Sequence, residues 1–159
     1  MPISRKLVVA SVVTLGIAGS VFAASHASEE AQAAVKARQS HMQLYAFNLG
    51  KLGAMAKGAV DYDADAASAA AANLAALSNM NQAAYWVAGS DSDTVEGSRT
   101  LPGMWDNIPD AIAKSQALAS AAAAMEEAAG TDLAALQGAM GAVGGSCGAC
   151  HKAYRKPKG

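Results

Sequence analysis

The chain has 159 residues, of which 52% are hydrophobic and 16% are charged, and its formal net charge is −1. This length suits one compact domain with a single core. Alanine supplies 41 of the residues and aromatic side chains only 5%, and because alanine favours helices and disfavours strands, an all-β fold is excluded. The charges are dispersed, so no basic stripe for a nucleic-acid partner is present. Two cysteines are too few for a disulfide scaffold.

The first residues have the pattern of an export signal. Arg5 and Lys6 precede an uncharged stretch over 7–24, and residues 21–23 (VFA) fit the small-residue pattern read by signal peptidase. We expect cleavage after residue 23, with sites one and four residues later as alternatives. The mature domain, residues 24–159, then has a net charge of −3 and resides in an oxidising bacterial compartment, the periplasm. A retained membrane anchor is the other interpretation, but the strongly apolar part is short for a span, and no later stretch is apolar enough to cross a membrane.

Two helices are predicted in the first half of the mature chain. Residues 29–58 carry apolar side chains at steps of three, four and seven, which marks one face of a long helix. The aspartates over 61–65 supply a helix cap, and a second apolar stripe continues over 63–87. Residues 88–100 are rich in Gly, Ser, Asp and Thr without apolar periodicity, so we expect one long loop there.

Two further helices complete the domain. The third is expected from Pro102 to Ala129, ending at Gly130, with Pro109 tolerated only in or near the first turn or at a kink. The fourth is capped by Thr131 or Asp132, and the glycines at 144 and 145 are expected to loosen it ahead of the cysteines. Four helices with short links predict an all-α fold, an antiparallel up-down-up-down four-helix bundle, in which cofactor sites are built from side chains on facing helices.

The chemistry concentrates in Cys147-Gly148-Ala149-Cys150-His151. On a helix these two thiols and the imidazole lie on one face, as is required when thiols add to the two vinyl groups of a haem and the histidine binds its iron. A thioredoxin-like redox pair is one alternative, but that motif follows a strand and none is expected. A zinc site is another, but it needs a fourth ligand, and only His26 and His41 remain among the histidines.

Motif and flanking residues resemble the class II cytochromes c, the family of cytochrome c′ and cytochrome c-556. The segments that match the family's pattern are Cys-X-X-Cys-His followed by AYR at 153–155, VKARQSHM at 35–42, LGAMAKG at 52–58, and Met104-Trp105. Pro109 departs from the usual pattern. The resemblance implies one covalently bound haem c, with iron ligated by His151 and attachment through Cys147 and Cys150.

The family divides at the fourth position after the arginine of its first helix, which is Met42 here. Cytochromes c′ carry Leu, Phe or Tyr there and leave iron five-coordinate, whereas c-556-type members carry a methionine that binds iron, so the resemblance implies that Met42 is the sixth ligand. Simple packing of Met42 is the alternative, since methionines such as Met80, Met125 and Met140 are expected in the core. Arg38, one turn earlier, is expected to pair with a haem propionate, or else to be a plain surface arginine.

Several other side chains are expected in the haem pocket or its surroundings. Trp86 is expected in the core at the end of the second helix and His41 on the surface, because it points about 100° away from Met42. Lys152, Lys156 and Lys158 form a small basic cluster, which also fits a solvated helix end. The expected walls of the pocket are Tyr45, Trp105 and Tyr154, with Arg155 beside the proximal histidine or simply exposed.

These features predict a periplasmic one-electron carrier with a low-spin His/Met-ligated haem, because two strong axial ligands leave iron no open position for a substrate. We expect no enzymatic activity, periplasmic redox proteins as partners, no membrane association after signal cleavage, and a monomer or a homodimer through the first and second helices. If Met42 does not bind iron, the alternative is a five-coordinate, cytochrome c′-like haem protein that binds nitric oxide or carbon monoxide.

Overall fold

The computed structural model describes residues 18–157, with side chains described from Glu29 onward. Over these residues the regular structure is helical, apart from one isolated bridge between Thr100 and Arg155. The all-α prediction is confirmed. The helices are α1 (Ala18–Ala56), α2 (Ala64–Asn79), α3 (Ile108–Ala129) and α4 (Leu133–Tyr154), with the short 3-10 helices η1 (Ala83–Tyr85) and η2 (Pro102–Asn107).

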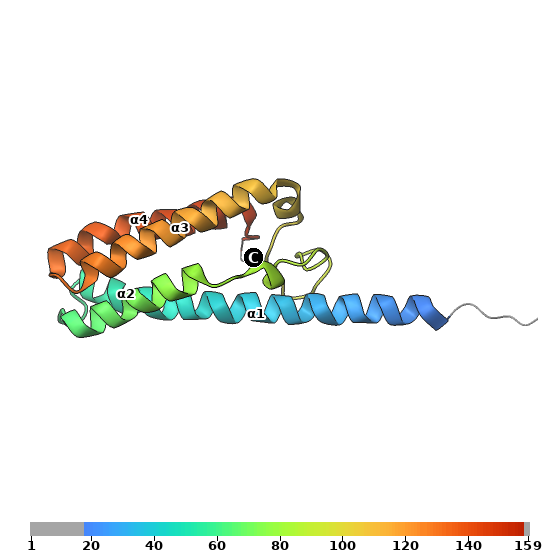
Figure 1. Ribbon diagram of the computed structural model, residues 1–159, viewed down its shortest axis with the longest axis horizontal. Coiled ribbons are helices and arrows are strands. Elements are labelled where there is room, and N and C mark those ends of the chain that lie inside the picture. Colours follow the sequence, from blue (N-terminus) through green and yellow to red (C-terminus); the bar gives the residue numbers. More distant parts are fainter. Residues whose placement is uncertain (1–17, 158–159) are drawn as a thin grey trace, which may run out of the picture.

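The four long helices form an up-down-up-down bundle of two layers. One layer contains α1 and α2, and the other contains α3 and α4 (Figure 1). The layers meet closely at the end where α1 turns into α2 and α3 turns into α4, and they separate towards the end that holds η1, η2 and the C-terminus (Figure 1). This splayed end positions the site described below.

Three of the predicted helix boundaries are confirmed by local contacts. Asp63 caps α2 by accepting the Ala66 N–H at 3.0 Å, and Asp132 caps α4 by accepting the Ala135 N–H at 2.7 Å. The third helix begins at Ile108 rather than at the predicted Pro102, because residues 102–107 form the 3-10 helix η2. Pro109 lies in the first turn of α3, where a missing N–H costs no helical hydrogen bond. The helix then ends before Gly130, as the sequence predicts.

The second helix is shorter in the structure than the sequence predicts. α2 ends at Asn79 rather than Val87, and Met80 adopts an extended conformation. The polar side chains here compete with the helical ladder: Ser78 and Asn79 both donate to the Ala75 carbonyl. The long connection therefore begins at Met80, which is 48% exposed and not part of the core.

The expected loosening of α4 at its glycines does not occur. The helix continues through Gly144 and Gly145 to Tyr154, because each glycine keeps its helical hydrogen bonds within a helix that packs along α3 and α1. The cysteine motif therefore stands on a continuous helix.

The core is built from many alanines and a few large side chains. Close packing of the layers follows from the small side chains, which let helix backbones approach. Met125 is fully buried, as predicted, and Met140 is partly buried against the core. The largest fully buried apolar side chains are Leu52, Met125, Leu136 and Val143.

The predicted export signal lies mostly outside the described residues. Residues 1–17 are not described, and the expected cleavage position falls in the first turns of α1, so cleavage stays a prediction. None of the helices among the described residues combines the length and the apolarity needed to traverse a lipid bilayer.

Candidate functional site

The thiols of Cys147 and Cys150 and the imidazole of His151 lie on the last two turns of α4. All three side chains are half-buried, and the two thiols are free rather than joined in a disulfide. Cys147 also packs against the bundle core. The cysteine motif therefore lies on a helix, as predicted.

The surroundings of these groups favour their neutral forms. Burial raises the pKa of both the Cys147 and the Cys150 thiols. Burial also lowers the pKa of His151, and the nearby positive charges of Arg155 and Arg99 lower it further. A neutral imidazole has a free lone pair on one ring nitrogen, which is the form that binds metal.

Two contacts show the register between the antiparallel helices α1 and α4. Gln137 Nε2 donates to the Ala56 carbonyl at 2.8 Å, and Met140 Cε lies 3.7 Å from where a Cβ on Gly53 would stand. Moving three residues back along α1, from Ala56 to Gly53, thus corresponds to moving three residues forward along α4, from Gln137 to Met140. Both helices rise about 1.5 Å per residue. Eleven residues further in the same directions, Met42 and His151 lie at the same level.

The helical faces agree with this register. Met140 faces α1, and Cys147 and His151 follow it by seven and eleven residues, which keeps them on the same stripe of α4. Leu49 and Gly53 line a shared hollow with Met140, and Met42 precedes Leu49 by seven residues on that stripe of α1. Met42 and His151 therefore point from facing sides of the two layers at the splayed end.

Met42 does not pack into the protein core. Its side chain is 37% exposed, whereas its neighbours Arg38, His41 and Tyr45 on the same helix are buried. Met42 therefore does not fill the protein core itself, and its ligation of iron stays a prediction beside the alternative that it only packs in the distal pocket.

Arg38 is neither a surface arginine nor free to turn. It is only 5% exposed, and its guanidinium lies 4.9 Å from the Trp86 ring centroid. It donates to the carbonyls of Tyr85 and Ser90 and to the hydroxyls of Ser90 and Ser98. Burial lowers its pKa, and the negative charge of Asp91 opposes that shift. The alternative of a plain surface arginine is wrong, and the expected pairing with a propionate stays a prediction.

His41 is buried, so its predicted surface position is wrong. The side chain is 3% exposed because η1 folds back over α1: its ring stands edge-on to Tyr45, with centroids 4.8 Å apart, and 5.7 Å from Tyr85. Its Nε2 is buried without a hydrogen-bond partner. Burial lowers the pKa of His41, an effect partly opposed by the backbone of Leu77.

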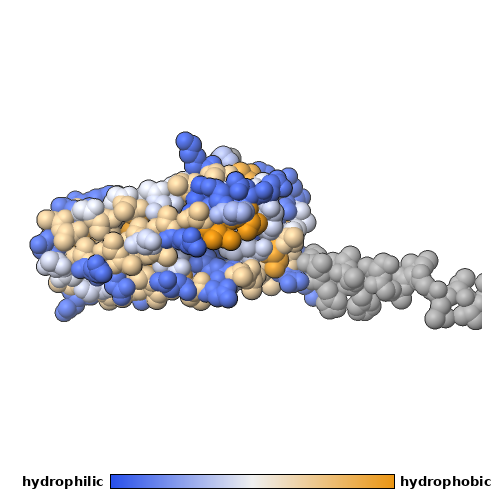
Figure 2. Space-filling view, turned by 45° about the horizontal axis from the view of Figure 1, so that its top comes forward, coloured by the Kyte–Doolittle hydropathy of each residue, from blue (hydrophilic) through white to orange (hydrophobic). Residues whose placement is uncertain are grey.

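The aromatic residues expected as pocket walls gather at the same end. Tyr45 is buried, and its phenol is close enough to Cys147 for that group's charge to contribute to its raised pKa, which burial dominates. Trp86 is half-buried in the connection after α2 rather than in a helix core, and its carbonyl accepts the Trp105 indole N–H at 3.2 Å. Figure 2 shows the most strongly hydrophobic surface on its face gathered towards this end of the bundle.

A hydrogen-bond chain, which the sequence interpretation missed, ties the start of α3 to the end of α4. The Tyr154 hydroxyl donates to Asp110 Oδ2, and Lys114 Nζ lies 2.8 Å from Asp110 Oδ1. Hydrogen bonds from Lys114 and then Tyr154 lower the pKa of Asp110. The same bond raises the pKa of Tyr154 to about 12. The i, i+4 spacing of Asp110 and Lys114 is visible in the sequence, but their link to Tyr154 is not.

Replacing Tyr154 with phenylalanine is expected to remove a stabilisation that the wild-type protein loses only at strongly alkaline pH. A raised pKa means that the folded state favours the protonated phenol, so this stabilisation is complete below about pH 10 and is lost as pH rises through about 12. Tyrosinate absorbance during an alkaline titration should show one phase near pH 12 that Tyr154→Phe abolishes. The matched control is Tyr62→Phe, which removes a phenol that donates to the Ala129 carbonyl and should leave the phase near pH 12 in place. Loss of that phase in the control, or its persistence in Tyr154→Phe, would show that another tyrosine is responsible.

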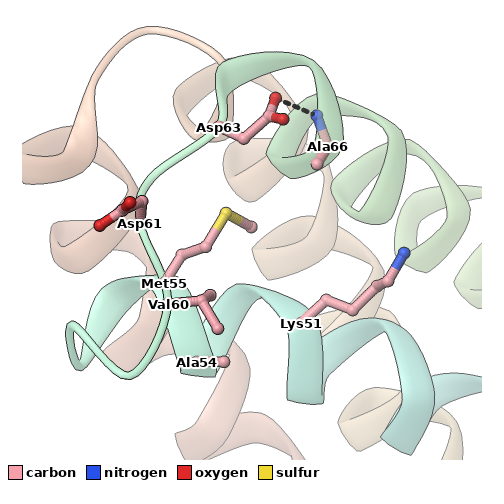
Figure 3. A pocket seen from close by; sticks show the side chains of 7 residues that line it. All are labelled: Lys51, Ala54, Met55, Val60, Asp61, Asp63 and Ala66. Atoms are coloured by element: carbon pink, nitrogen blue, oxygen red, sulfur yellow. Dashed lines mark hydrogen bonds between the residues drawn. The ribbon is translucent and has the colours of Figure 1, made fainter.

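The remaining predicted side chains are exposed or outside the described residues, and one further hollow lies at the far end of the bundle. Lys152, Lys156 and Arg155 are exposed, and Lys158 is beyond the described residues. Within the described part of the chain, no three His, Cys, Asp or Glu side chains cluster as a metal site, which gives the zinc alternative no support. A hollow of about 330 Å³ lies where α1 turns into α2, beneath Met55 and beside the Asp63 cap (Figure 3). It includes none of the predicted site residues.

Comparison with known proteins identifies the family of this arrangement. The model of a family described as cytochrome c′ matches residues 33–155. The chain belongs to the cytochrome c′ family. Cytochrome c-554 of Cereibacter sphaeroides is 44% identical over 122 residues, which cover 77% of this chain and 92% of that protein. The prediction of a class II cytochrome c is confirmed.

Solved structures agree on the fold and on the cofactor. A cytochrome c′ from Rhodobacter sphaeroides superposes with a TM-score of 0.78 at 37% identity, covering 80% of this chain and 98% of its own. A nitric oxide complex of a cytochrome c′ variant from Alcaligenes xylosoxidans gives 0.71 at 35% identity, covering 80% and 97%. A cytochrome c′ with ligand-controlled dimer dissociation gives 0.74 at 28% identity, covering 80% and 97%. The cofactor of this c-type cytochrome family is haem c with its iron, as predicted.

Proposed function

We propose that this cytochrome is a periplasmic one-electron carrier in which Cys147 and Cys150 hold the haem and His151 and Met42 ligate its iron. Haem c bound in this way supplies a reversible one-electron exchange at iron. The observation that supports the proposal is the register of α1 and α4 at their far end, which, continued for eleven residues along both helices, brings Met42 and His151 to the same level.

The side chains of the site fit a covalently bound haem c. Two free thiols three residues apart and a neutral imidazole stand on one helix face, as two thioethers and a proximal ligand require. The thioether of Met42 is a soft neutral donor that suits iron in an electron carrier. Its partial exposure among buried neighbours fits a side chain whose packing partner is the cofactor.

The protein contributes a fixed environment rather than acid–base chemistry. Met42 and His151 are carried by the long helices α1 and α4, so oxidation and reduction are proposed to require little rearrangement of the chain. His41 Nε2 has no hydrogen-bond partner, and the Tyr45 hydroxyl accepts from Gln82 Nε2 at 3.5 Å, so these two groups do not bond to each other. We therefore propose a carrier rather than an enzyme.

A second candidate is a five-coordinate haem protein that binds nitric oxide or carbon monoxide. The comparisons favour this candidate, since the solved relatives described above are cytochromes c′ and one is a nitric oxide complex. It requires Met42 to stay off the iron. The spin state of the resting ferric protein separates the two candidates, with a low-spin spectrum for the carrier and a high-spin spectrum for the gas-binding protein.

The proposed partners are periplasmic redox proteins, and the proposed assembly is a monomer or a homodimer through α1 and α2. One solved relative is a dimer whose dissociation is controlled by a ligand. On this chain, Leu44 and Phe47 are exposed on the outer side of α1, with Phe47 62% exposed. Apolar side chains on an outer helix face are typical of a pairing surface.

A further inference from the structure

The connection between α2 and η2 crosses the splayed end of the bundle and is fastened at both ends. We call residues 85–101 the strap. Residues 85–98 of the strap are bound to α1, since Arg38 donates to Tyr85, Ser90 and Ser98 as described above. Gln39 Nε2 adds a bond to the Gly97 carbonyl at 2.9 Å. Gly97 has a φ of 81°, a conformation that favours glycine.

The last residues of the strap are bound to the end of α4. Leu101 N–H donates to the Tyr154 carbonyl at 2.9 Å, and Lys156 N–H donates to the Arg99 carbonyl at 2.8 Å. The Arg99 guanidinium in turn donates to the Lys156 carbonyl at 2.6 and 3.1 Å. The strap thus joins α1 to the residues just beyond His151.

Hydrogen bonds within the strap connect the part bound to α1 with the part bound to α4. Asp91 accepts the N–H groups of Asp93 and Thr94 and the Thr94 hydroxyl, which closes a compact turn. Ser92 N–H also donates to the Thr100 carbonyl at 2.8 Å and draws the two sides of the strap together. Because these internal hydrogen bonds already restrict the loop to few conformations, fastening both of its ends costs less conformational entropy than it would for a free chain.

The position of the strap matters because α1 and α4 diverge there. At the far end, Gln137 of α4 binds α1 directly, but the layers separate towards the end that holds η1, η2 and the C-terminus (Figure 1). The register places Met42 and His151 towards that end. We infer that the strap sets the distance between α1 and α4 at the level of these two residues, and that Arg38 is thereby a positioning residue for the sixth iron ligand. The ligand part of this inference rests on the proposed function.

The test compares two exposed glutamines that make the same kind of bond at opposite ends of the bundle. Gln39→Ala removes the bond from α1 to the strap, and Gln137→Ala removes the bond from α4 to α1 at the far end. Arg38→Gln is the strong variant, and Ser98→Ala is a milder one that keeps the cation. Each is prepared as holoprotein and measured for carbon monoxide affinity in the ferrous state and for amide hydrogen exchange in residues 40–46 and 147–155.

A looser strap should free the sixth position more often. Apparent affinity scales with the fraction of molecules whose position is open, so Arg38→Gln should raise carbon monoxide affinity roughly tenfold and the milder variants by about twofold to threefold. Exchange in both helix segments should rise in parallel. Gln137→Ala should change neither. An unchanged affinity in Arg38→Gln, where Met42→Leu raises it, overturns the strap proposal and leaves the proposed function standing.

The two proposals fail in different ways. If Met42→Leu leaves carbon monoxide affinity unchanged, the proposed ligation fails, and with it the role of Arg38 towards a sixth ligand. The strap as a link between α1 and α4 is then supported by faster exchange in residues 147–155 of Arg38→Gln and overturned by unchanged exchange. If Arg38→Gln does not fold, Gln39→Ala and Ser98→Ala give the same comparison.

Discussion

Replacing Met42 with leucine should convert the protein from a low-spin, six-coordinate form to a high-spin, five-coordinate form. Leucine keeps about the same volume but has no donor atom, so only ligation to iron explains a change of spin state. The reduction potential should fall, because the soft thioether that favours ferrous iron is lost. Optical spectra of the ferric and ferrous variant measure the spin state directly.

The same variant should gain affinity for small gases. If Met42 occupies the sixth position in about 99% of molecules, its removal raises the apparent carbon monoxide affinity on the order of 100-fold. A methionine that only packs would give a cost below about 1.5 kcal/mol in the free energy of unfolding and no spectral change. Leu44→Ala on the outer side of α1 is a suitable control, since it changes an exposed side chain near Met42 and should leave the spectrum as it is.

Replacing both Cys147 and Cys150 with serine should abolish covalent haem attachment and strongly destabilise the fold. A cofactor that binds only the native state stabilises it by mass action, by about 4 kcal/mol at a thousand times its dissociation constant. For a domain of this size, such a loss corresponds to a fall in melting temperature of more than about 10 °C. Circular dichroism during thermal unfolding of the haem-free and haem-bound chains gives the comparison, and each single serine variant should show weakened retention of haem.

The control for this experiment lies inside the motif. Gly148 is exposed, and a Cβ built on it meets nothing within 4 Å. Gly148→Ala should keep covalent haem and raise the free energy of unfolding by about 0.5–1 kcal/mol, because alanine restricts the unfolded chain more than glycine does. Equal melting temperatures for the haem-free and haem-bound chains would contradict the view that haem and helices share one core.

Helical periodicity and caps made most of the fold predictable. Asp63, Asp132 and Gly130 mark helix boundaries by local chemistry, which a sequence contains in full. The end of α2 was missed because the choice between helix and loop after Asn79 depends on competing side-chain bonds and on the strap that follows. Such competition is decided by tertiary contacts rather than by propensity.

The candidate site likewise has one part that the sequence predicts and another part that depends on tertiary contacts. The spacing of Cys147, Cys150 and His151 on one helix face is a local property, so it could be read directly from the sequence. The burial of Arg38 and His41 depends on residues more than 40 positions away, such as Tyr85 and Ser90. A single helix pattern does not contain that information, and both side chains were expected on the surface or at the haem.

The most direct test of the account is the optical spectrum of the purified holoprotein, ferric and then ferrous, at neutral pH. Ligation by Met42 and His151 predicts low-spin spectra in both states, with little change when carbon monoxide is first added to the ferrous protein. A high-spin ferric spectrum, with rapid formation of a carbon monoxide complex on reduction, would contradict the proposed carrier and establish the gas-binding alternative, with His151 as the sole protein ligand.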